Sequence, residues 1–328
     1  MFLTSKLFEA IFERPYYNIG LRKLQIITGY ASSSFLHHIL GKFPEIQIEL
    51  IIGMAKKDGI NFWDHQEYIR LTSETNRVKV YYLDSIPGNH SKIYYWKDET
   101  LFSSGATFVG SANFSWNGFR DQNELMVQTN YASPEEVFTV GPLIECTENI
   151  DRKIKLHTVR ATIRTLKAPN EEFTGAVFLN KQFTMLPYVD LPLYDERTNS
   201  VQQIAGLNWG QRLGREPNQA YIKVPTQFNK DKTDFFPSKE QEFTMLTDDG
   251  DSFVCVMAQE GRKAIETTRN NSILGRYFRD RLGLKHGVKV ELEDLEKYGN
   301  LFVRVYKIDN ETYYMDYSVP ESSYKISK

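Results

Sequence analysis

The chain has 328 residues, of which 41% are hydrophobic and 25% are charged, and its formal net charge is −2. These values are typical of soluble globular proteins and exclude a disordered chain or one with a strongly basic overall field. No apolar run reaches the ~18–20 residues that cross a bilayer, so we expect a cytoplasmic protein without a signal peptide. Cys146 and Cys255 are far apart in the sequence, which argues against a disulfide framework or a zinc site.

The first part of the chain alternates helix-like and strand-like patterns. A helix is predicted at residues 5–14, where apolar residues recur at helical spacing. Strands are predicted at 23–32, 46–55, 78–84, 91–96, 106–113 and 123–129. A further helix is expected to begin with Ser133 as its N-cap and Pro134 at its first position. Strands that alternate with helices indicate an α/β domain.

Polar side chains that could take part in catalysis follow one another closely after Gly88. His90 and Lys92 are two residues apart on a predicted strand, so both side chains point to the same face. A neutral imidazole can attack phosphorus and can return a proton to a leaving alkoxide. Lys92 would then hold phosphate oxygens, Asn113 would donate a second hydrogen bond, and Glu124 would hold the imidazole tautomer. The alternative is an ordinary polar hairpin, because a lone His-x-Lys pair arises easily by chance.

The complete order of these residues is more specific than the pair. His90, Lys92, Gly110-Ser111-x-Asn113 and Glu124 resemble the signature of the phospholipase D superfamily. The resemblance implies a phosphodiesterase in which Ser111 shapes the turn before Asn113. The superfamily pattern places an aspartate at position 97, where this chain has Lys97, with Asp98 one residue later. The role of carboxylate partner to the imidazole is therefore assigned to Glu124.

Copy number adds a prediction about assembly. In the superfamily reaction one histidine attacks phosphorus and a second protonates the leaving group, so two motifs must meet. The other histidines, none of which has a lysine two residues on, are His37, His38, His65, His157 and His286. The second motif must come from another chain, which predicts a homodimer through the N-terminal domain with one composite site at its axis. No metal or other cofactor is required, because imidazole supplies the nucleophile.

A rival nuclease pattern lies further along the chain. Asp151-Arg152-Lys153 fits the D-x-K half of a magnesium-dependent restriction fold. Such triplets are common by chance, and no well-placed acidic partner on a strand accompanies this one. We prefer the histidine mechanism.

The second part of the chain contains many short strands and one prominent helix. The prolines of residues 186–195 favour edge or linker backbone. Strands are predicted at 220–225, 242–259 as a hairpin, 288–294, 301–308 and 311–318, and a helix at 271–284. This pattern indicates a mainly-β, barrel-like domain. We predict an N-terminal α/β domain at 1–167, a linker at 168–186 and the mainly-β domain at 187–328.

The C-terminal half is similar to the DNA-binding domain of phospholipase-D-type restriction endonucleases of the NgoFVII and BfiI kinds. The segments that carry this resemblance are 206–225, 243–253, 263–284 and 306–318. The resemblance implies a pseudobarrel like that of the plant B-three transcription factors, which reads the major groove of DNA with two loop arms. Together the two resemblances span nearly the whole chain.

Residues suited to DNA contacts cluster in two loops, and residues 261–285 form a basic run. Arginine pairs with guanine edges, and asparagine or glutamine pairs with adenine. The predicted arm residues are Trp209, Gln211, Arg212 and Arg215 in one loop, and Thr267, Arg269, Asn270 and Asn271 in the other. Lys223, Arg276 and Arg279 are predicted to contact phosphates. The alternative for each residue is a solvated surface position or an internal ion pair.

We expect a site-specific, metal-independent restriction endonuclease of the type II kind, part of a restriction–modification system, that binds double-stranded DNA at a short specific site. One alternative is a nuclease subunit whose cleavage needs a separate ATP-dependent, helicase-like partner, since the chain has no G-x(4)-G-K-[ST] motif of its own. Another is a non-catalytic DNA-binding protein. A lipid phosphodiesterase is disfavoured by the missing second motif and the polar second domain.

Overall fold

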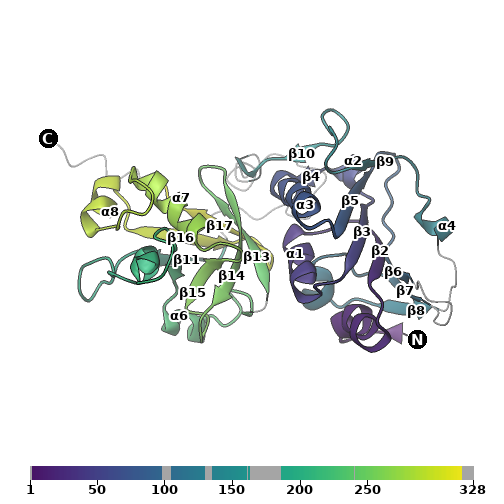
Figure 1. Ribbon diagram of the computed structural model, residues 1–328, viewed down its shortest axis with the longest axis horizontal. Coiled ribbons are helices and arrows are strands. Elements are labelled where there is room, and N and C mark those ends of the chain that lie inside the picture. Colours follow the sequence, from purple (N-terminus) through teal and green to yellow (C-terminus); the bar gives the residue numbers. More distant parts are fainter. Residues whose placement is uncertain are drawn as a thin grey trace. The chain divides into compact units, whose positions relative to one another are not determined.

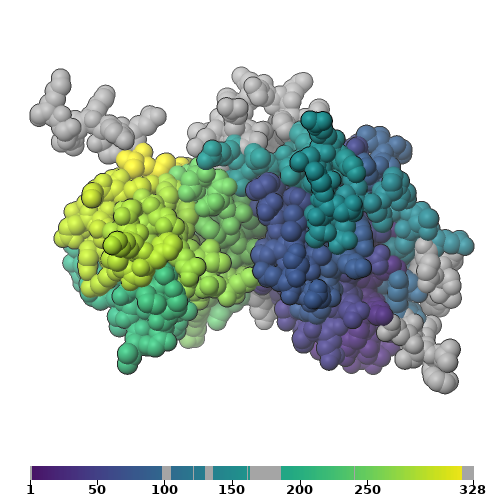
Figure 2. Space-filling view, turned by 45° about the horizontal axis from the view of Figure 1, so that its top comes forward, coloured from purple at the N-terminus to yellow at the C-terminus, as the bar shows by residue number. Residues whose placement is uncertain are grey.

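The computed structural model describes residues 2–97, 105–129, 135–160, 162, 186–239 and 241–319. The chain divides into a first compact unit, mainly Met1–Ala161, and a second, mainly Phe178–Lys328. Figure 2 shows both in space-filling form, the first in purple to teal and the second in green to yellow. The predicted linker lies outside the described residues except for Leu186.

The first unit is built on an eight-stranded mixed sheet, as the α/β pattern predicts (Figure 1). The strand order is β1-β8-β7-β6-β2-β3-β5-β9. Their bounds are β1 Phe2–Leu3, β2 Lys23–Thr28, β3 Gln47–Ile52, β5 Val78–Leu83, β6 Ile93–Lys97, β7 Ala106–Gly110, β8 Met126–Thr129 and β9 Leu143–Glu145. Strands β2, β3 and β5 are parallel, whereas β6 runs antiparallel to β2. The residues just before β6 therefore lie at the edge where β2 ends.

Helices of the first unit lie against this sheet, with η1 and α1 on one face of its strands. Their bounds are η1 Glu9–Ile19, α1 Ser33–Lys42, α2 Ala55–Asp58, α3 Phe62–Thr75, η2 Asn117–Asp121 and α4 Glu135–Phe138. Alternate strand residues such as Leu50, Tyr94 and Phe108 share one buried cluster with Phe12 of η1 and Phe35 of α1. A short parallel pair, β4 Ile60–Asn61 with β10 Leu156–His157, completes the unit. The first helix occurs close to its prediction, and the predicted caps Ser133 and Pro134 lie outside the described residues.

The second unit is a curved, mostly antiparallel sheet of seven strands, in the order β11-β16-β17-β13-β14-β15-β12. The strands are β11 Tyr188–Pro192, β12 Ile222–Lys223, β13 Glu242–Thr247, β14 Ser252–Ala258, β15 Ala264–Thr267, β16 Phe302–Lys307 and β17 Thr312–Asp316. The helices are η4 Gly206–Gln211, α6 Thr226–Asp231, α7 Ser272–Leu282 and α8 Leu292–Tyr298. The proline-rich segment provides an edge strand, β11, in agreement with the sequence. This mainly-β unit is consistent with the predicted pseudobarrel.

One predicted strand of this unit is wrong. Residues 288–294 alternate in hydropathy, but helix α8 begins inside them at Leu292. Glu291 and Asp294 form a capping box, in which each side chain accepts a hydrogen bond from the other residue's backbone amide. Reciprocal capping satisfies amides at the helix start and sets its boundary.

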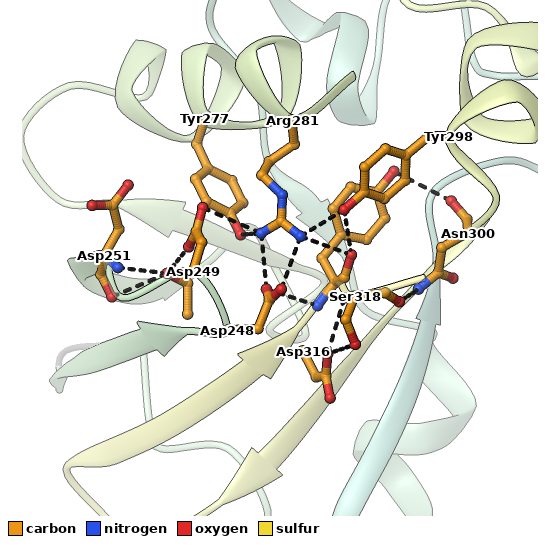
Figure 3. A network of polar contacts seen from close by, with 11 residues as sticks. Asp248, Asp249, Asp251, Tyr277, Arg281, Tyr298, Asn300, Asp316 and Ser318 are labelled. Carbon is orange, nitrogen blue, oxygen red and sulfur yellow. Dashed lines mark hydrogen bonds and ion pairs between the residues drawn. The ribbon is translucent and has the colours of Figure 1, made fainter. Parts of the chain in front are cut away.

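A polar network around Arg281 fixes α7 within the second unit (Figure 3). Its guanidinium donates to both carboxylate oxygens of Asp248, at 2.9 and 2.8 Å, and to the hydroxyls of Tyr277 and Tyr298, at 2.9 and 2.6 Å. It also donates to the carbonyl of Tyr317 at 3.0 Å. These bonds join α7, α8, the β13–β14 turn and the residue after β17. Arg281 belongs to the basic run of the sequence but acts as an internal, fully paired cation.

In the part of the chain that the structure describes, no helix has the length and apolar character needed to span a membrane.

Candidate active site and DNA-binding surface

The predicted nucleophile and cation meet directly before β6. Nζ of Lys92 lies 2.9 Å from Nδ1 and 3.0 Å from Nε2 of His90, and it donates to the His90 carbonyl oxygen at 2.7 Å. His90 is exposed to solvent, whereas only 5% of Lys92 is exposed. A buried ammonium thus lies against a solvent-accessible imidazole.

Electrostatics favours the neutral imidazole. Burial, followed by the ammonium of Lys92 and that of Lys57, lowers the pKa of His90, and the carboxylate of Asp58 opposes this effect. Burial also lowers the pKa of Lys92, which Glu124 counteracts. A lowered pKa keeps the imidazole unprotonated, and therefore nucleophilic, further toward acidic pH.

Asn113 reaches the same place from the turn after β7. Its Oδ1 accepts hydrogen bonds from the amide of Tyr30 at 3.2 Å and the hydroxyl of Thr28 at 3.3 Å. With Oδ1 engaged, the Nδ2 group is the donor that can face a phosphate oxygen. The structure therefore brings His90, Lys92 and Asn113 together at one edge of the sheet.

The residues that support this arrangement were not predicted from the sequence. A Cβ atom added to Gly29 would lie 2.6 Å from Cδ2 of His90 and 3.4 Å from Oδ1 of Asn113, so a side chain there would displace the imidazole. Thr28, Gly29 and Tyr30 follow β2 directly. The glycine that ends this buried strand was the one available signal, because backbone that approaches closely to another group favours glycine.

Ser111 and Glu124 form a second contact in the motif. The Ser111 hydroxyl donates to Oε2 of Glu124 and accepts from the amide of Leu125 at 3.0 Å. Ser111 thereby joins the turn after β7 to the start of β8. No hydrogen bond between Glu124 and His90 occurs among the described residues, so its role as tautomer holder stays a prediction. Asp98 lies outside those residues.

The rival triplet Asp151-Arg152-Lys153 lies exposed in turns that follow β9. Over the described ranges, no group of three or more His, Cys, Asp or Glu side chains is arranged to hold a metal ion.

In the second unit the structure brings the two predicted arms together. The amide of Ala220 donates to the carbonyl of Asn271 at 3.0 Å, and the hydroxyl of Ser272 donates to Oε2 of Glu216. A Cβ atom at Gly275 would lie 1.7 Å from the Asn218 carbonyl oxygen, which shows how closely α7 approaches the first arm. Glu216 connects the two arms, and the sequence did not reveal this role because Ser272 and Arg276, its partners in α7, are distant in the chain.

The first arm presents an aromatic platform. The Arg215 guanidinium lies 3.8 Å above the ring of Trp209, and Tyr221 packs against the same ring edge-on with centroids 5.5 Å apart. Arg215 also donates to the side chain of Gln219 at 2.8 Å. Stacking restricts the guanidinium before any DNA is bound, which reduces the entropy lost on binding.

The predicted DNA-binding residues differ in accessibility. The exposed ones are Arg212, Arg215, Lys223, Arg269, Asn270 and Arg276, and those of intermediate exposure are Trp209, Gln211 and Asn271. The Gln211 amide donates to the carbonyls of Pro217 and Gly287, each at 3.1 Å, so it braces the arm.

Two of the predicted contacts are wrong. Arg279 has no exposed surface, and its guanidinium donates to the carbonyls of Val288 at 2.7 Å and Gly275 at 3.1 Å. It therefore cannot reach a phosphate. Thr267 is 4% exposed and donates to the carbonyl of Asn270 at 2.8 Å, so it shapes the second arm instead of contacting bases.

Comparison with known families matches both units. Residues 7–154 match the NgoFVII restriction endonuclease N-terminal PLD domain, and residues 185–309 match the NgoFVII C-terminal B3-like DNA-binding domain. The chain belongs to the NgoFVII restriction endonuclease family. It is a restriction endonuclease in which a phospholipase D-like domain precedes a B3-like DNA-binding domain, as its sequence predicted.

Two solved structures align with part of the chain at low identity. Polyphosphate kinase from Porphyromonas gingivalis aligns with a TM-score of 0.30 and 15% identity, over 42% of this chain and 21% of the kinase. NucT from Helicobacter pylori aligns with a TM-score of 0.28 and 18% identity, over 42% of this chain and 90% of NucT. The chain thus spans about a fifth of the kinase. No curated protein matches the chain.

Proposed function

We propose that this restriction endonuclease hydrolyses DNA phosphodiesters at a specific site without a metal cofactor, through a covalent phosphohistidine. The observation that carries the proposal is the contact of the Lys92 ammonium, within 3.0 Å, with both ring nitrogens of the exposed His90. A nucleophile, a fixed cation and the amide of Asn113 provide the three functions that phosphoryl transfer needs, namely attack, charge neutralisation and orientation.

In the first step a ring nitrogen of His90 attacks phosphorus. A P–N bond forms while the P–O bond to the leaving deoxyribose breaks. The leaving oxygen takes a proton from the imidazolium of His90 in a second copy of the chain. Lys92 and Nδ2 of Asn113 stabilise the negative charge that grows on the non-bridging oxygens.

In the second step water attacks the phosphohistidine. The second imidazole, now neutral, accepts a proton from that water as the P–N bond breaks. The products are a phosphate end and a hydroxyl end, and both histidines regain their starting protonation states. Each atom and proton is accounted for without an external cofactor.

The second imidazole comes, in this proposal, from a homodimer. Within the described part of the first unit, other histidines have different partners: Nδ1 of His65 contacts the Tyr82 hydroxyl at 2.9 Å, and Nε2 of His157 donates to the Asp58 carbonyl at 2.8 Å. Val109 and Leu125, beside the motif turn, are 38% and 45% exposed. These apolar side chains next to a half-complete site offer contact area to a second copy related by twofold symmetry.

The target specificity is assigned to the exposed arms of the B3-like unit. Arg215 on its Trp209 platform is suited to base edges, and Lys223 and Arg276 are suited to phosphates. A net charge of −2 gives little attraction to DNA in general, so binding depends on these local cations and on the correct sequence.

Cleavage assays with purified protein on mixed DNA in EDTA test the proposal. Wild type is expected to cut, and His90→Ala is expected to bind the same site without cutting. Strict dependence on Mg²⁺ contradicts the mechanism. Cleavage that occurs only with ATP and a helicase-like protein supports the subunit alternative, and site binding without any cleavage supports a non-catalytic protein.

A further inference from the structure

Two residues outside the superfamily signature lie beside the nucleophile. Tyr30 follows β2, and Asp58 ends helix α2, which follows β3. Because β2 and β3 are parallel, both residues lie at the edge of the sheet that carries His90.

The contacts form a continuous chain from a carboxylate to the imidazole. The Tyr30 hydroxyl donates to Oδ2 of Asp58 at 2.6 Å. The Tyr30 ring packs against the His90 ring in a T-shaped arrangement, with centroids 5.6 Å apart and planes at 73°. Such aromatic pairs have a preferred geometry, so an anchored Tyr30 restricts the imidazole.

The backbone of this pair is fixed as well. The Tyr30 amide donates to Oδ1 of Asn113 at 3.2 Å, and its carbonyl accepts from the Thr28 hydroxyl at 2.8 Å. The Asp58 carbonyl accepts from Nε2 of His157 at 2.8 Å. Tyr30 therefore connects Asn113 of the motif with Asp58, and neither end of the connection depends on an exposed flexible side chain.

We propose that Tyr30 and Asp58 form a positioning pair that orients the His90 ring and supplies the negative charge that supports its protonated state. The proposal rests on the proposed phosphohistidine function. Neither residue contacts the reacting phosphorus, so both act through His90.

The charges around His90 agree with this role. Lys92, which directly precedes β6, and Lys57 of α2 disfavour the imidazolium, whereas Asp58 favours it. Glu124 acts on Lys92. Burial, followed by Asp58, raises the pKa of Tyr30 to about 12, so its hydroxyl remains a donor over the working range.

The two members of the pair have opposite predicted effects. Asp58→Asn removes the negative charge and lowers the pKa of His90. Tyr30→Phe keeps the ring but leaves the Asp58 carboxylate without its phenol donor, so the carboxylate acts more strongly and the pKa rises. In a bell-shaped profile of cleavage against pH, both limbs should move to lower pH in the first variant and to higher pH in the second.

The test is a histidine NMR titration of the full chain, with the His90 resonance assigned from His90→Ala, combined with cleavage profiles. Matched controls are Asp84→Asn, whose carboxylate pairs with Lys56, and Tyr17→Phe, whose hydroxyl is exposed. Asp58→Glu keeps the negative charge and should retain the pH dependence of cleavage seen in the wild type. We expect cleavage by Asp58→Asn and Tyr30→Phe to fall roughly tenfold at neutral pH.

Shifts of the His90 pKa in opposite directions in the two variants, larger than those in the controls, support the proposed positioning pair. An unmoved His90 pKa in both variants, with only a lower melting temperature, reduces the pair to a structural role and overturns the proposal. The titration needs no catalysis. A wild type that fails to cut in EDTA would therefore contradict the proposed function without deciding the test of the pair.

Discussion

The two units use cationic side chains in different ways. In the first unit Lys92 lies against an exposed histidine, and both residues directly precede β6. In the second unit, Arg279 and Arg281 of the basic run are internal supports, whereas Arg276 of the same helix is exposed. The spacing of Lys92 from His90 in the sequence predicted a cation beside the candidate nucleophile, but local charge density did not predict which cations of the second unit are exposed. The lesson is that a basic run must be divided by burial before it is assigned to DNA.

The largest effect is expected on the cleavage rate when the candidate nucleophile of the first unit is removed. His90→Ala should lower the cleavage rate by about 10⁴-fold or more, because the nucleophile is lost, and leave DNA affinity unchanged. Single-turnover cleavage and a binding assay measure the two quantities. His286→Ala, a change at an exposed histidine of the second unit, is the control. Retained cleavage by His90→Ala would break the assignment of chemistry to the first unit.

Loss of the buried Arg279 guanidinium should lower the stability of the second unit. Arg279→Met leaves buried carbonyls without donors and should lower the free energy of unfolding by about 2–4 kcal/mol. Arg276→Met on the same helix should leave stability nearly unchanged and weaken DNA binding, with a salt slope smaller by about 1. Thermal melts measure the effect of each variant on stability, and salt titrations measure its effect on DNA binding. Equal effects of the two changes would contradict the division by burial.

A smaller effect is expected at the glycine behind the nucleophile. Gly29→Ala adds a Cβ that would lie 2.6 Å from the His90 ring, so the imidazole must move. Because His90 is an exposed side chain, the fold should tolerate the change while cleavage falls by about 10- to 100-fold. Gly41→Ala is the control, since a Cβ there meets no atom within 4 Å. A wild-type cleavage rate in Gly29→Ala would show that cleavage does not depend on this exact position of the His90 imidazole.

A last comparison concerns the Trp209–Arg215 platform in the second unit. Arg215→Ala should reduce affinity for the recognised site by about 1–3 kcal/mol and change nonspecific binding little. Competition binding with specific and random duplexes measures the ratio. Gln227→Ala, on helix α6, is a surface control. A uniform loss on all sequences would reassign Arg215 to phosphate contact.

Much of the first site could be predicted from the sequence because its members are close in the chain and in the sheet. Strands β6 and β7 are antiparallel neighbours, and the Gly110 amide donates to the Lys92 carbonyl at 3.1 Å, so Ser111 and Asn113 follow at the motif edge. Thr28 ends β2, Tyr30 follows it and Asp58 ends α2, and tertiary packing alone brings them to the site.

The sequence was less informative for the second unit. Alternating hydropathy at 288–294 is compatible with a strand, but a capping box converts its second half into helix. Arg279 has the composition of a phosphate contact, yet the close approach of α7 to the Asn218 loop buries it. Both errors arise where contacts distant in sequence override a local pattern.

Subunit mixing tests the central claim, that two chains contribute one His90 each to a single site. Wild type and His90→Ala are unfolded, mixed in equal amounts, refolded together and assayed in EDTA. If the site is composite, only dimers of two wild-type chains cut. Activity should then fall to about a quarter of that of wild type alone at the same total protein concentration. Activity of about one half would mean that each chain cuts alone, and it would contradict the account.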